Sequence, residues 1–327
     1  MRAVLIVNPN ATSTTAAGRD LLAHALESRV RLTVEHTNHP GHATEIAAAA
    51  AADGVDVVIV HGGDGTVNEV VNGLLGEPGR RSLTPAPAVA VVPGGSANVF
   101  ARSLGISPDP IEATNLLVDL LGSRGPKRDW RRIGLMDCGE RWAVFTAGIG
   151  VDGEVVAAVE SHRNRGRKHK GVTASRYIRV AVPAVLRSAR REPRLTLQLP
   201  DRDPVTGVHF VFVSNSSPWT YANTRPIWTN PDTRFETGLG VFATTSMSIW
   251  RNLGLVRQMV AKRPKLSAKH LIRCDDVDWV QVTSDTPVAT QIDGDYIGER
   301  ESLTFRSVPD ALDVVAPLPN NAPTCNN

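Results

Sequence analysis

The 327-residue sequence lacks most features of a secreted or membrane-spanning protein. Its three cysteines, Cys138, Cys274 and Cys325, are far apart and form no Cys-x-x-Cys pair. Isolated cysteines in odd number argue against a disulfide framework and a cysteine zinc site. No run of 18 apolar residues occurs, and the short apolar start before Asn8-Pro9 is not typical of a signal peptide. These absences predict a cytoplasmic protein.

The sequence also lacks a strong charge of either sign and is poor in aromatic residues. Lys plus Arg number 36 and Asp plus Glu 33, which gives a net charge of +3, and aromatic residues make up 5% of the chain. Neither value is typical of a protein that binds nucleic acid, so no nucleic-acid partner is predicted. No His-Glu-x-x-His motif occurs, and no histidine is assigned to a metal.

The first 125 residues alternate between short apolar runs and segments with helical spacing. Strands are predicted at 4–7, 30–35, 55–60 and 88–92, and helices at 12–28, 43–52, 66–75 and 111–121. This alternation predicts an α/β domain over residues 1–125, with a doubly wound, mostly parallel sheet.

The pattern changes at a predicted linker, residues 122–126. Strands are predicted at 130–136, 141–147, 194–199, 208–214, 239–245, 278–283, 288–292, 301–306 and 312–315, and helices near 153–160, 172–190 and 248–261. Residues 126–306 therefore form a predicted β-rich second domain. The Pro/Asn-rich segment 317–327 is predicted to be a disordered tail.

The sharpest local motif is Gly62-Gly63-Asp64-Gly65-Thr66, between the strand predicted at 55–60 and the helix predicted at 66–75. Adjacent glycines let a backbone turn tightly and approach a ligand, and the N–H groups of the following helix point back at the turn. A carboxylate such as Asp64 beside a phosphate requires a divalent cation between them or a hydroxyl proton to accept. The motif is also compatible with a glycine-rich turn in which Asp64 or Thr66 caps the helix.

Other turns after predicted strands carry similar residues. Asn8-Pro9-Asn10-Ala11-Thr12-Ser13 follows the first strand, Thr37 the second, and Pro93-Gly94-Gly95-Ser96-Ala97-Asn98 the fourth. In a parallel sheet these turns lie at one edge, where ligands bind. They predict a nucleoside triphosphate site that is not a Walker P-loop, since no Gly-x4-Gly-Lys-Ser/Thr occurs.

Together with Gln291-Ile292-Asp293-Gly294, these turns resemble the diacylglycerol kinase catalytic-domain family. That family includes bacterial lipid kinases and sphingosine and ceramide kinases. The resemblance runs from residue 4 to about 316. The Gly-Gly-Asp-Gly-Thr element is shared with NAD kinases, and the later Asp293-Gly294 favours the lipid-kinase branch.

The resemblance implies a Rossmann-like N-terminal domain and a sandwich-like β-rich C-terminal domain with a cleft between them, and a return of residues 307–316 to the first domain as an added strand. It implies a kinase that uses ATP and Mg²⁺. The positions that match nucleotide-binding residues of the family are Asn8, Asn10, Thr12, Thr37, Gly62, Gly63, Asp64, Gly65, Thr66, Asn68, Glu69, Gly94, Gly95 and Ser96.

Three carboxylates are the implied catalytic residues. Asp293 or Asp295 would accept the proton of the attacking hydroxyl, and Asp64 would hold the ATP-bound Mg²⁺ or orient the hydroxyl. The residues alone leave a second interpretation open, because Asp-Gly is also the strongest short hairpin signal. The chain departs from the family pattern in Asp295, where relatives usually have Glu, and in Val99, where many diacylglycerol kinases have Asp.

The resemblance also raises a structural metal site in the second domain. Bacterial relatives often bind Mg²⁺ through an Asp-Asp-Gly turn. The matching turn here is Phe235-Glu236-Thr237-Gly238, with Asp232 upstream. Thr237 replaces one of the carboxylates, which argues against a metal at Asp232 and Glu236.

A second glycine motif, Gly148-Ile149-Gly150-Val151-Asp152-Gly153, fits the dinucleotide pattern Gly-x-Gly-x-x-Gly. A ribose-binding acid is expected about 20 residues later. The sequence has no Asp or Glu from Ser161 to Arg191. The motif is therefore interpreted as a tight turn from a strand into a helix.

The acid-poor segment 161–194 holds nine Arg, two Lys and one Glu, an excess of +10. It is predicted to attract an anionic membrane surface, and its helical part alternatively packs into the domain core. The sequence thus predicts a peripherally membrane-associated kinase that acts on a lipid, most simply diacylglycerol, and that could form a homodimer. An NAD or other soluble-metabolite kinase and a catalytically silent nucleotide-binding regulator remain the alternatives.

Overall fold

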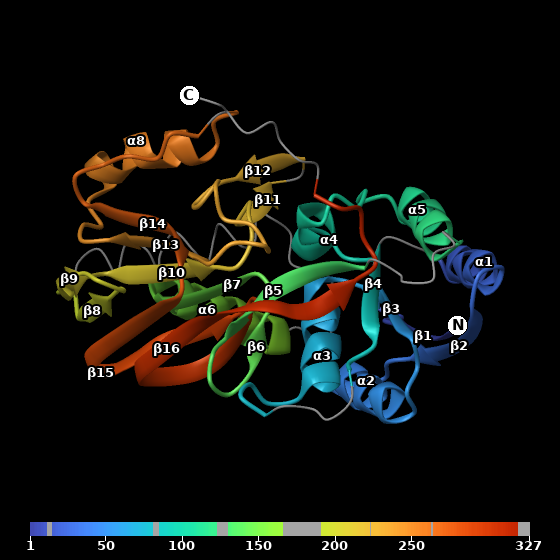
Figure 1. Ribbon diagram of the computed structural model, residues 1–327. Helices are drawn as coiled ribbons and strands as arrows, with labels where there is room; N and C mark the ends of the chain where they lie inside the picture. Colours follow the sequence, from blue (N-terminus) through green and yellow to red (C-terminus); the bar gives the residue numbers. More distant parts are fainter. Residues whose placement is uncertain are drawn as a thin grey trace. The chain divides into compact units, whose positions relative to one another are not determined.

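The computed structural model describes residues 1–11, 15–80, 85–122, 130–165, 191–222, 224–262 and 264–319. The chain divides into two compact units (Figure 1). Unit 1 comprises Met1–Leu75, Ser82–Ile133 and Leu312–Asn327, and unit 2 comprises Gly76–Arg81 and Gly134–Ala311. Among the described residues, no helix has the length and apolar character needed to cross a membrane.

Unit 1 is built on a parallel sheet in the order β4-β3-β1-β2. Its strands are β1 (Arg2–Val7), β2 (Arg31–His36), β3 (Val57–Gly62) and β4 (Ala88–Pro93). Every residue of β3 and β4 is buried, as expected for central strands covered on both faces. The last residues of β16 (Asp295–Val314) add to this sheet, because Val314 pairs in parallel with Val89 of β4.

Five helices are described in unit 1. They are α1 (Ala16–Glu27), α2 (His42–Ala52), α3 (Asp64–Leu75), α4 (Val99–Ser103) and α5 (Pro110–Gly122). Leucines of α1 and α5 share one apolar cluster with alternate residues of β1, β3 and β4. On α3, a Cβ at Gly73 would collide with the backbone carbonyl of Thr44, so this glycine lets α2 and α3 pack closely. The α/β architecture predicted from the sequence is confirmed, whereas the short helix α4 was not predicted.

Unit 2 is β-rich and mostly antiparallel, as predicted. One sheet runs in the order β14-β13-β10-β7-β15-β16. Its strands are β7 (Thr146–Gly150), β10 (Phe210–Ser214), β13 (Leu239–Thr244), β14 (Leu271–Val277), β15 (Trp279–Ile292) and β16. Shorter strands extend it or pair beside it: β5 (Arg131–Asp137), β6 (Trp142–Ala143), β8 (Leu195–Gln198), β9 (Val205–Val208), β11 (Thr220–Ala222) and β12 (Arg225–Ile227).

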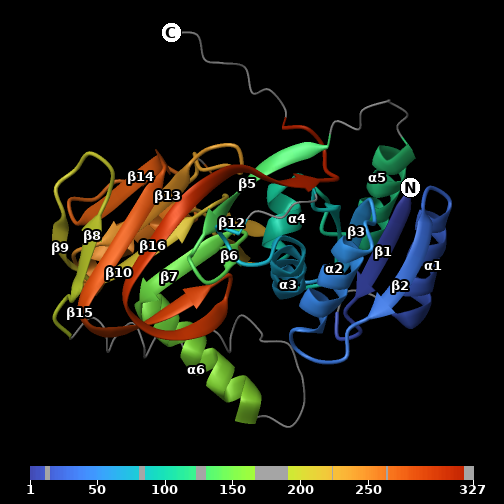
Figure 2. The same ribbon diagram turned by 60° about the horizontal axis from the view of Figure 1, so that its bottom comes forward.

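Two strands of unit 2 are longer than predicted. The runs at 278–283 and 288–292 belong to one strand, β15, with a register shift between Thr283 and Val288. The runs at 301–306 and 312–315 likewise fall along β16, which extends to Val314. The polar residues in between are of types that favour turns, yet they continue the strands, which bend along their length (Figure 2). Because it is long, β15 pairs with β8 through 281–284 and with β7 through 290–292.

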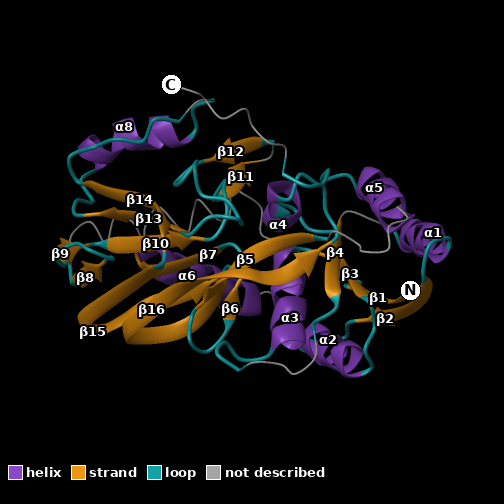
Figure 3. Cartoon of the chain, in the orientation of Figure 1, coloured by secondary structure: helices purple, strands orange, loops and turns teal. Residues whose placement is uncertain are grey.

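Two helices are described in unit 2, α6 (Val151–Arg165) and α8 (Ile249–Met259), which Figure 3 shows in purple. The main hydrophobic core of unit 2 is formed by side chains of its strands, largely Val, Leu and Ile. A second cluster joins Leu255 of α8 to Phe212 and Phe242 of the sheet. The helix predicted at 172–190 lies outside the described residues, as do most of the predicted linker and residues 320–327 of the predicted tail.

Candidate functional site

The two glycine turns of unit 1 contact each other directly at the carboxyl edge of the sheet. The N–H of Gly94 donates to the carbonyl of Gly62 at 2.8 Å. A Cβ on Gly95 would lie 2.8 Å from the Cα of Gly63, and a Cβ on Gly94 would lie 3.0 Å from the Cα of Gly62. These glycines are therefore needed for backbone-to-backbone packing of the turns after β3 and β4.

The helix that follows the first glycine turn begins two residues earlier than predicted. Helix α3 starts at Asp64, so Asp64, Gly65 and Thr66 form its first turn. The N–H groups of a first helical turn have no partner within the helix, and they carry the positive end of the helix dipole. Gly65 is exposed, and a Cβ there would meet nothing within 4 Å. The geometry is suited to an anion that approaches the backbone at this turn.

Asp64 ties the two turns together. Its Oδ2 accepts the N–H of Val99, and its Oδ1 accepts the N–H of Phe100, both at 3.0 Å. These donors belong to the first turn of α4, so the carboxylate caps a helix that follows the second glycine turn. Burial raises the pKa of Asp64, and the backbone N–H groups oppose that shift. Asp64 therefore caps α4 and not the helix that follows its own motif, which the turn interpretation expected it to cap.

Asn98 belongs to the turn singled out in the sequence, where no role is assigned to it. It lies at φ 49°, in the left-handed region that favours glycine. Its Oδ1 accepts the N–H of Gly95 at 2.9 Å and its Nδ2 donates to the carbonyl of Gly95 at 2.8 Å. The side chain therefore closes the second glycine turn, while Ser96 at the tip of that turn is exposed. An Asn that follows Gly-Gly-Ser-Ala was a usable signal for such a turn.

The turn after β1 joins the same edge. Asn8 donates from Nδ2 to Thr66 Oγ1 at 3.1 Å, and its Oδ1 accepts the N–H of Asn10. The N–H of Thr37 donates to the carbonyl of Val7, so the turn after β2 lies beside it. Thr12 lies outside the described residues.

Two of the implied nucleotide-binding residues lie deeper in unit 1. Asn68 is fully buried within α3, and its Oδ1 accepts from Asn72 Nδ2 at 3.1 Å. Glu69 accepts the N–H of Ala43 at 3.2 Å through Oε2, and its carbonyl accepts from Thr44 Oγ1. Glu69 thus caps the first turn of α2, and its carboxylate stabilises the contact between two helices.

The Asp293 turn of unit 2 is a hairpin between β15 and β16. Asp293 and Gly294 lie at φ 50° and 85°, the signs of a type I′ turn, so the hairpin interpretation of Asp-Gly is correct. Asp293 is only 5% exposed. Its Oδ2 accepts the N–H of Val144 at 2.6 Å, and its Oδ1 accepts those of Phe145 and Thr146 at 3.0 and 2.8 Å. Three N–H donors stabilise an ionised carboxylate and fix its position.

Asp295 differs from Asp293 in its exposure and in the partner of its carboxylate. Its side chain is 52% exposed, and its recorded partner is Arg141, with Nη2 at 3.4 Å from Oδ2. An exposed ion pair of this length is weak. Of the two acids, Asp295 has the carboxylate that is open to solvent.

A buried acid, Asp152, is linked to the Asp293 turn through Gln291. Asp152 Oδ2 accepts from Gln291 Nε2 at 2.6 Å, and Gln291 Oε1 accepts the N–H of Gly294 at 2.8 Å. Burial raises the pKa of Asp152 to about 7, and the bond from Gln291 opposes the shift. Sequence reasoning missed this residue, although it lies within the second glycine motif.

That motif is a tight turn from strand to helix, as predicted. Strand β7 ends at Gly150 and α6 begins at Val151. Gly150 has φ 90°, and a Cβ on Gly153 would collide with the backbone at Ala289 of β15. The glycines serve the packing of α6 on the sheet, and no feature of the described residues connects them with a dinucleotide.

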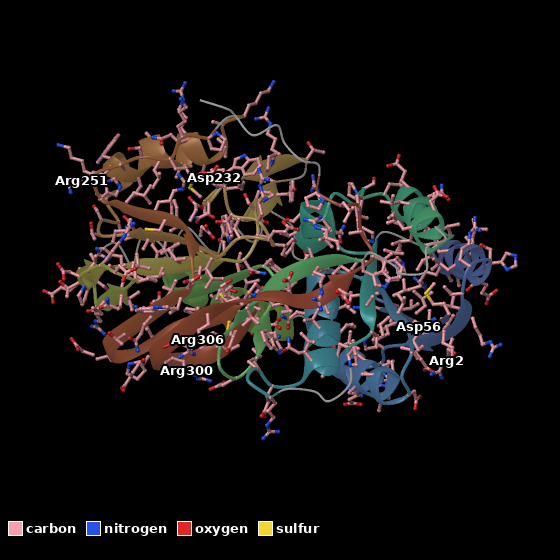
Figure 4. The ribbon with its side chains drawn as sticks, viewed as in Figure 1. Arg2, Asp56, Asp232, Arg251, Arg300 and Arg306 are labelled. Atoms are coloured by element: carbon pink, nitrogen blue, oxygen red, sulfur yellow. The ribbon has the colours of Figure 1, made fainter. Side chains whose placement is uncertain are left out.

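The turn with the implied structural metal does not fit a cation. Arg273 Nη2 lies 2.7 Å from Asp232 Oδ2 and 2.6 Å from Asp275 Oδ2, so a guanidinium neutralises both carboxylates (Asp232 is labelled in Figure 4). Asp276 accepts the N–H of Gly238 instead of pointing at a metal. Among the described residues, neither Asp232 nor Glu236 belongs to a group of potential metal ligands.

Such a group does occur at His39, His42 and Glu45, near the start of α2. The N–H of Asn38 donates to His42 Nδ1 at 3.2 Å, which places the ring proton on Nε2 and leaves no lone pair there for a metal. His39 Nε2 is 3.9 Å from Glu45 Oε2. The cluster is consistent with an imidazole–carboxylate contact, and no metal is assigned to it.

The molecule therefore combines an α/β unit, which carries interlocked glycine turns suited to phosphate, with an antiparallel unit that presents an exposed acid beside a buried one. Residues 2–123 match the sequence model of the diacylglycerol kinase catalytic domain. Over this part, which is less than half of the chain, the sequence is similar to the diacylglycerol kinase catalytic-domain family.

Curated relatives match the chain over about a third of its length. A diacylglycerol kinase of Bacillus subtilis (strain 168) is 40% identical over 118 residues, 34% of this chain and 35% of that protein. A protein of Chromohalobacter salexigens named "Probable lipid kinase YegS-like" is 36% identical over 101 residues, 31% of each chain. The matched segment thus spans about a third of these relatives.

Solved structures extend the likeness of fold to nearly the whole chain. Two structures from Bacillus anthracis str. Sterne, described as a diacylglycerol kinase and a putative diacylglycerol kinase, cover 97% of this chain and are covered by it to 97%. Their TM-scores are 0.70 and 0.71 at 18% and 19% identity. At this identity the match concerns the fold alone.

Proposed function

We propose that the protein is an ATP- and Mg²⁺-dependent lipid kinase that transfers the γ-phosphoryl group to a lipid hydroxyl, with diacylglycerol as acceptor and phosphatidic acid as product. The observation that carries this proposal is the contact between the turns Gly62–Gly63 and Gly94–Gly95, which holds them beside the first turn of α3, whose N–H groups have no partner within the helix. The similarity of residues 2–123 to the diacylglycerol kinase catalytic domain supports it.

In this proposal the turns bind the phosphates of MgATP, and Asp64 acts by holding the second turn against the first. Asp64 has both oxygens bonded to α4, so it shapes the site, and the Mg²⁺ enters with the nucleotide as part of the substrate. Transfer of the γ-phosphoryl group requires the attacking and leaving oxygens to lie in line, neutralisation of the phosphate charge, and an acceptor for the hydroxyl proton. We assign the acceptor role to Asp295, whose carboxylate is exposed, and a positioning role to Asp293.

The proposal is tested with labelled ATP against a panel of acceptors. The lipids are diacylglycerol, ceramide, a sphingoid base and a prenol in mixed micelles, and the soluble acceptor is NAD. We expect Mg²⁺-dependent labelling of diacylglycerol. Labelling of NAD alone would replace the proposal with a soluble-metabolite kinase, and ATP binding without any labelled product would replace it with a silent regulator.

Two variants separate the roles of the two acids. Asp295→Asn is expected to lower kcat by about 10²- to 10⁴-fold, the usual contribution of a general base, with ATP affinity and stability unchanged. Its matched control is Asp278→Asn, a change at another exposed acid of unit 2, with no loss expected. Full activity of Asp295→Asn would remove the acceptor role from this residue.

A further inference from the structure

Helix α8 presents a row of large apolar side chains to solvent. Trp250 is 86% exposed, Leu253 61%, Val256 55% and Val260, just past the end of the helix, 48%. We call these four residues the α8 outer face. They make up half of the eight large apolar side chains that are exposed among the described residues, and the other four are scattered. A cluster of this kind marks an interaction surface, whereas single exposed apolar residues need no explanation.

The packing of α8 does not account for the outer face. At about 100° per residue, the four side chains fall within an arc of about 120°. Leu255 and Met259 lie on the opposite side and pack against Phe212 and Phe242 of the sheet. The helix therefore has one apolar face that is used by the core of unit 2 and a second that the described part of the unit leaves uncovered.

The surroundings of the outer face are strongly basic. The sequence contains no Asp or Glu between Glu236 and Asp275. The exposed cations on and after α8 are Arg251, Arg257, Lys262, Lys265 and Lys269. None of them forms an ion pair with a described residue. Arg251 points away from the strands (Figure 4).

We propose that the α8 outer face docks on the surface of an anionic lipid bilayer, with Trp250 and Leu253 entering the interface. An apolar row that includes Trp, flanked by cations that form no ion pair with a described residue, is the pattern of a helix lying in the plane of a membrane. A second copy of the chain is disfavoured as the occupant, because it would bring two cationic surfaces together. The inference rests on the proposed function, since a lipid kinase must reach a substrate that resides in a bilayer.

The test is flotation of the full chain with vesicles that contain neither diacylglycerol nor ATP. The vesicles are phosphatidylcholine alone or with a third of phosphatidylglycerol. The double variant Trp250→Ser/Leu253→Ser is expected to lower the partition coefficient on anionic vesicles by about thirtyfold or more, from the apolar area it removes. The control Leu21→Ser/Ile111→Ser changes two side chains of unit 1 with similar exposure and is expected to leave binding unchanged.

The electrostatic part is tested with Arg251→Gln/Arg257→Gln. Each charge removed is expected to weaken binding about fivefold at low salt, and less at high salt. The control is Arg29→Gln/Arg31→Gln in unit 1. Unchanged binding of either α8 variant, or equal binding of the wild type to neutral and anionic vesicles, would overturn the proposal. A wild-type dimer that Trp250→Ser/Leu253→Ser dissociates would overturn it in favour of a second copy.

The same proteins, assayed on a short-chain diacylglycerol dispersed as monomers, separate this proposal from the function. We expect α8 variants to phosphorylate the monomeric substrate at the wild-type rate. If the wild type binds anionic vesicles through α8 but phosphorylates no lipid, the kinase proposal fails and the docking surface stands.

Discussion

The glycine turns of unit 1 and the Asp293 turn of unit 2 are held in different ways. In unit 1, Gly94 and Gly95 lie directly against the backbone of Gly62 and Gly63, so the absence of a side chain is the feature that matters. In unit 2, one carboxylate collects three N–H groups from residues about 150 positions away. Added atoms at Gly94 or Gly95 should therefore destabilise unit 1, and loss of the Asp293 carboxylate should destabilise unit 2.

The largest effect on stability is expected for Asp293→Ala. Removal of the carboxylate leaves the N–H groups of Val144, Phe145 and Thr146 without their acceptor, which costs on the order of 3 kcal/mol of unfolding free energy. Urea denaturation of the full chain measures this loss. Asp310→Ala is the control, because Asp310 also has φ 50° but is exposed. Equal losses in both variants would mean that backbone strain, not the hydrogen bonds, determines the cost.

A smaller effect is expected for Gly95→Ala in unit 1. The added Cβ would lie 2.8 Å from the Cα of Gly63, so the turns must separate, at a cost of about 2 kcal/mol. ATP affinity should fall with stability, because the same turns carry the N–H groups. Gly65→Ala adds the same atom where nothing lies within 4 Å and should leave stability unchanged. The contact between the turns is unimportant if both variants unfold at the wild-type urea concentration.

The third prediction concerns pH and Asp152, behind the Asp293 turn. Burial raises the pKa of Asp152 from 3.8 to about 7. Between these values the folded protein holds a proton that the unfolded chain has released, so the unfolding free energy contributed by this residue falls as pH rises. Asp152→Asn should remove that slope, as measured by urea denaturation from pH 4 to 8, whereas Asp278→Asn should retain it. Parallel curves for the wild type and Asp152→Asn would contradict the assignment.

The smallest effect is expected at Arg273. Because its guanidinium neutralises Asp232 and Asp275, chelators should not change the melting temperature of the wild type. Arg273→Gln leaves the two carboxylates without their cation and should cost about 1 kcal/mol, part of which Mg²⁺ or Ca²⁺ restores. Arg234→Gln, a change at an exposed neighbour, should show neither effect. Destabilisation of the wild-type protein by chelators would instead support a structural metal at this turn.

The same contrast explains how much of the molecule the sequence could predict. The strands of unit 1 and its glycine turns are local patterns, so their positions and their common edge followed from the sequence. The partners of Asp64, Asp293 and Arg273 are distant in the chain, and no spacing rule indicates them. The length of β15 was underestimated for a related reason, since its polar residues continue a strand that only distant partners can specify.

The parallel pairing of Val314 with Val89 has a practical consequence for work on isolated pieces of the protein. The N–H of Val315 also donates to the carbonyl of Val89, at 2.9 Å. A fragment cut to residues 2–123 would retain the glycine turns after β3 and β4 but would leave the backbone of β4 at Val89 without this partner. Exposed strand edges recruit other chains, so such a fragment would tend to aggregate unless the last segment of the protein were supplied with it.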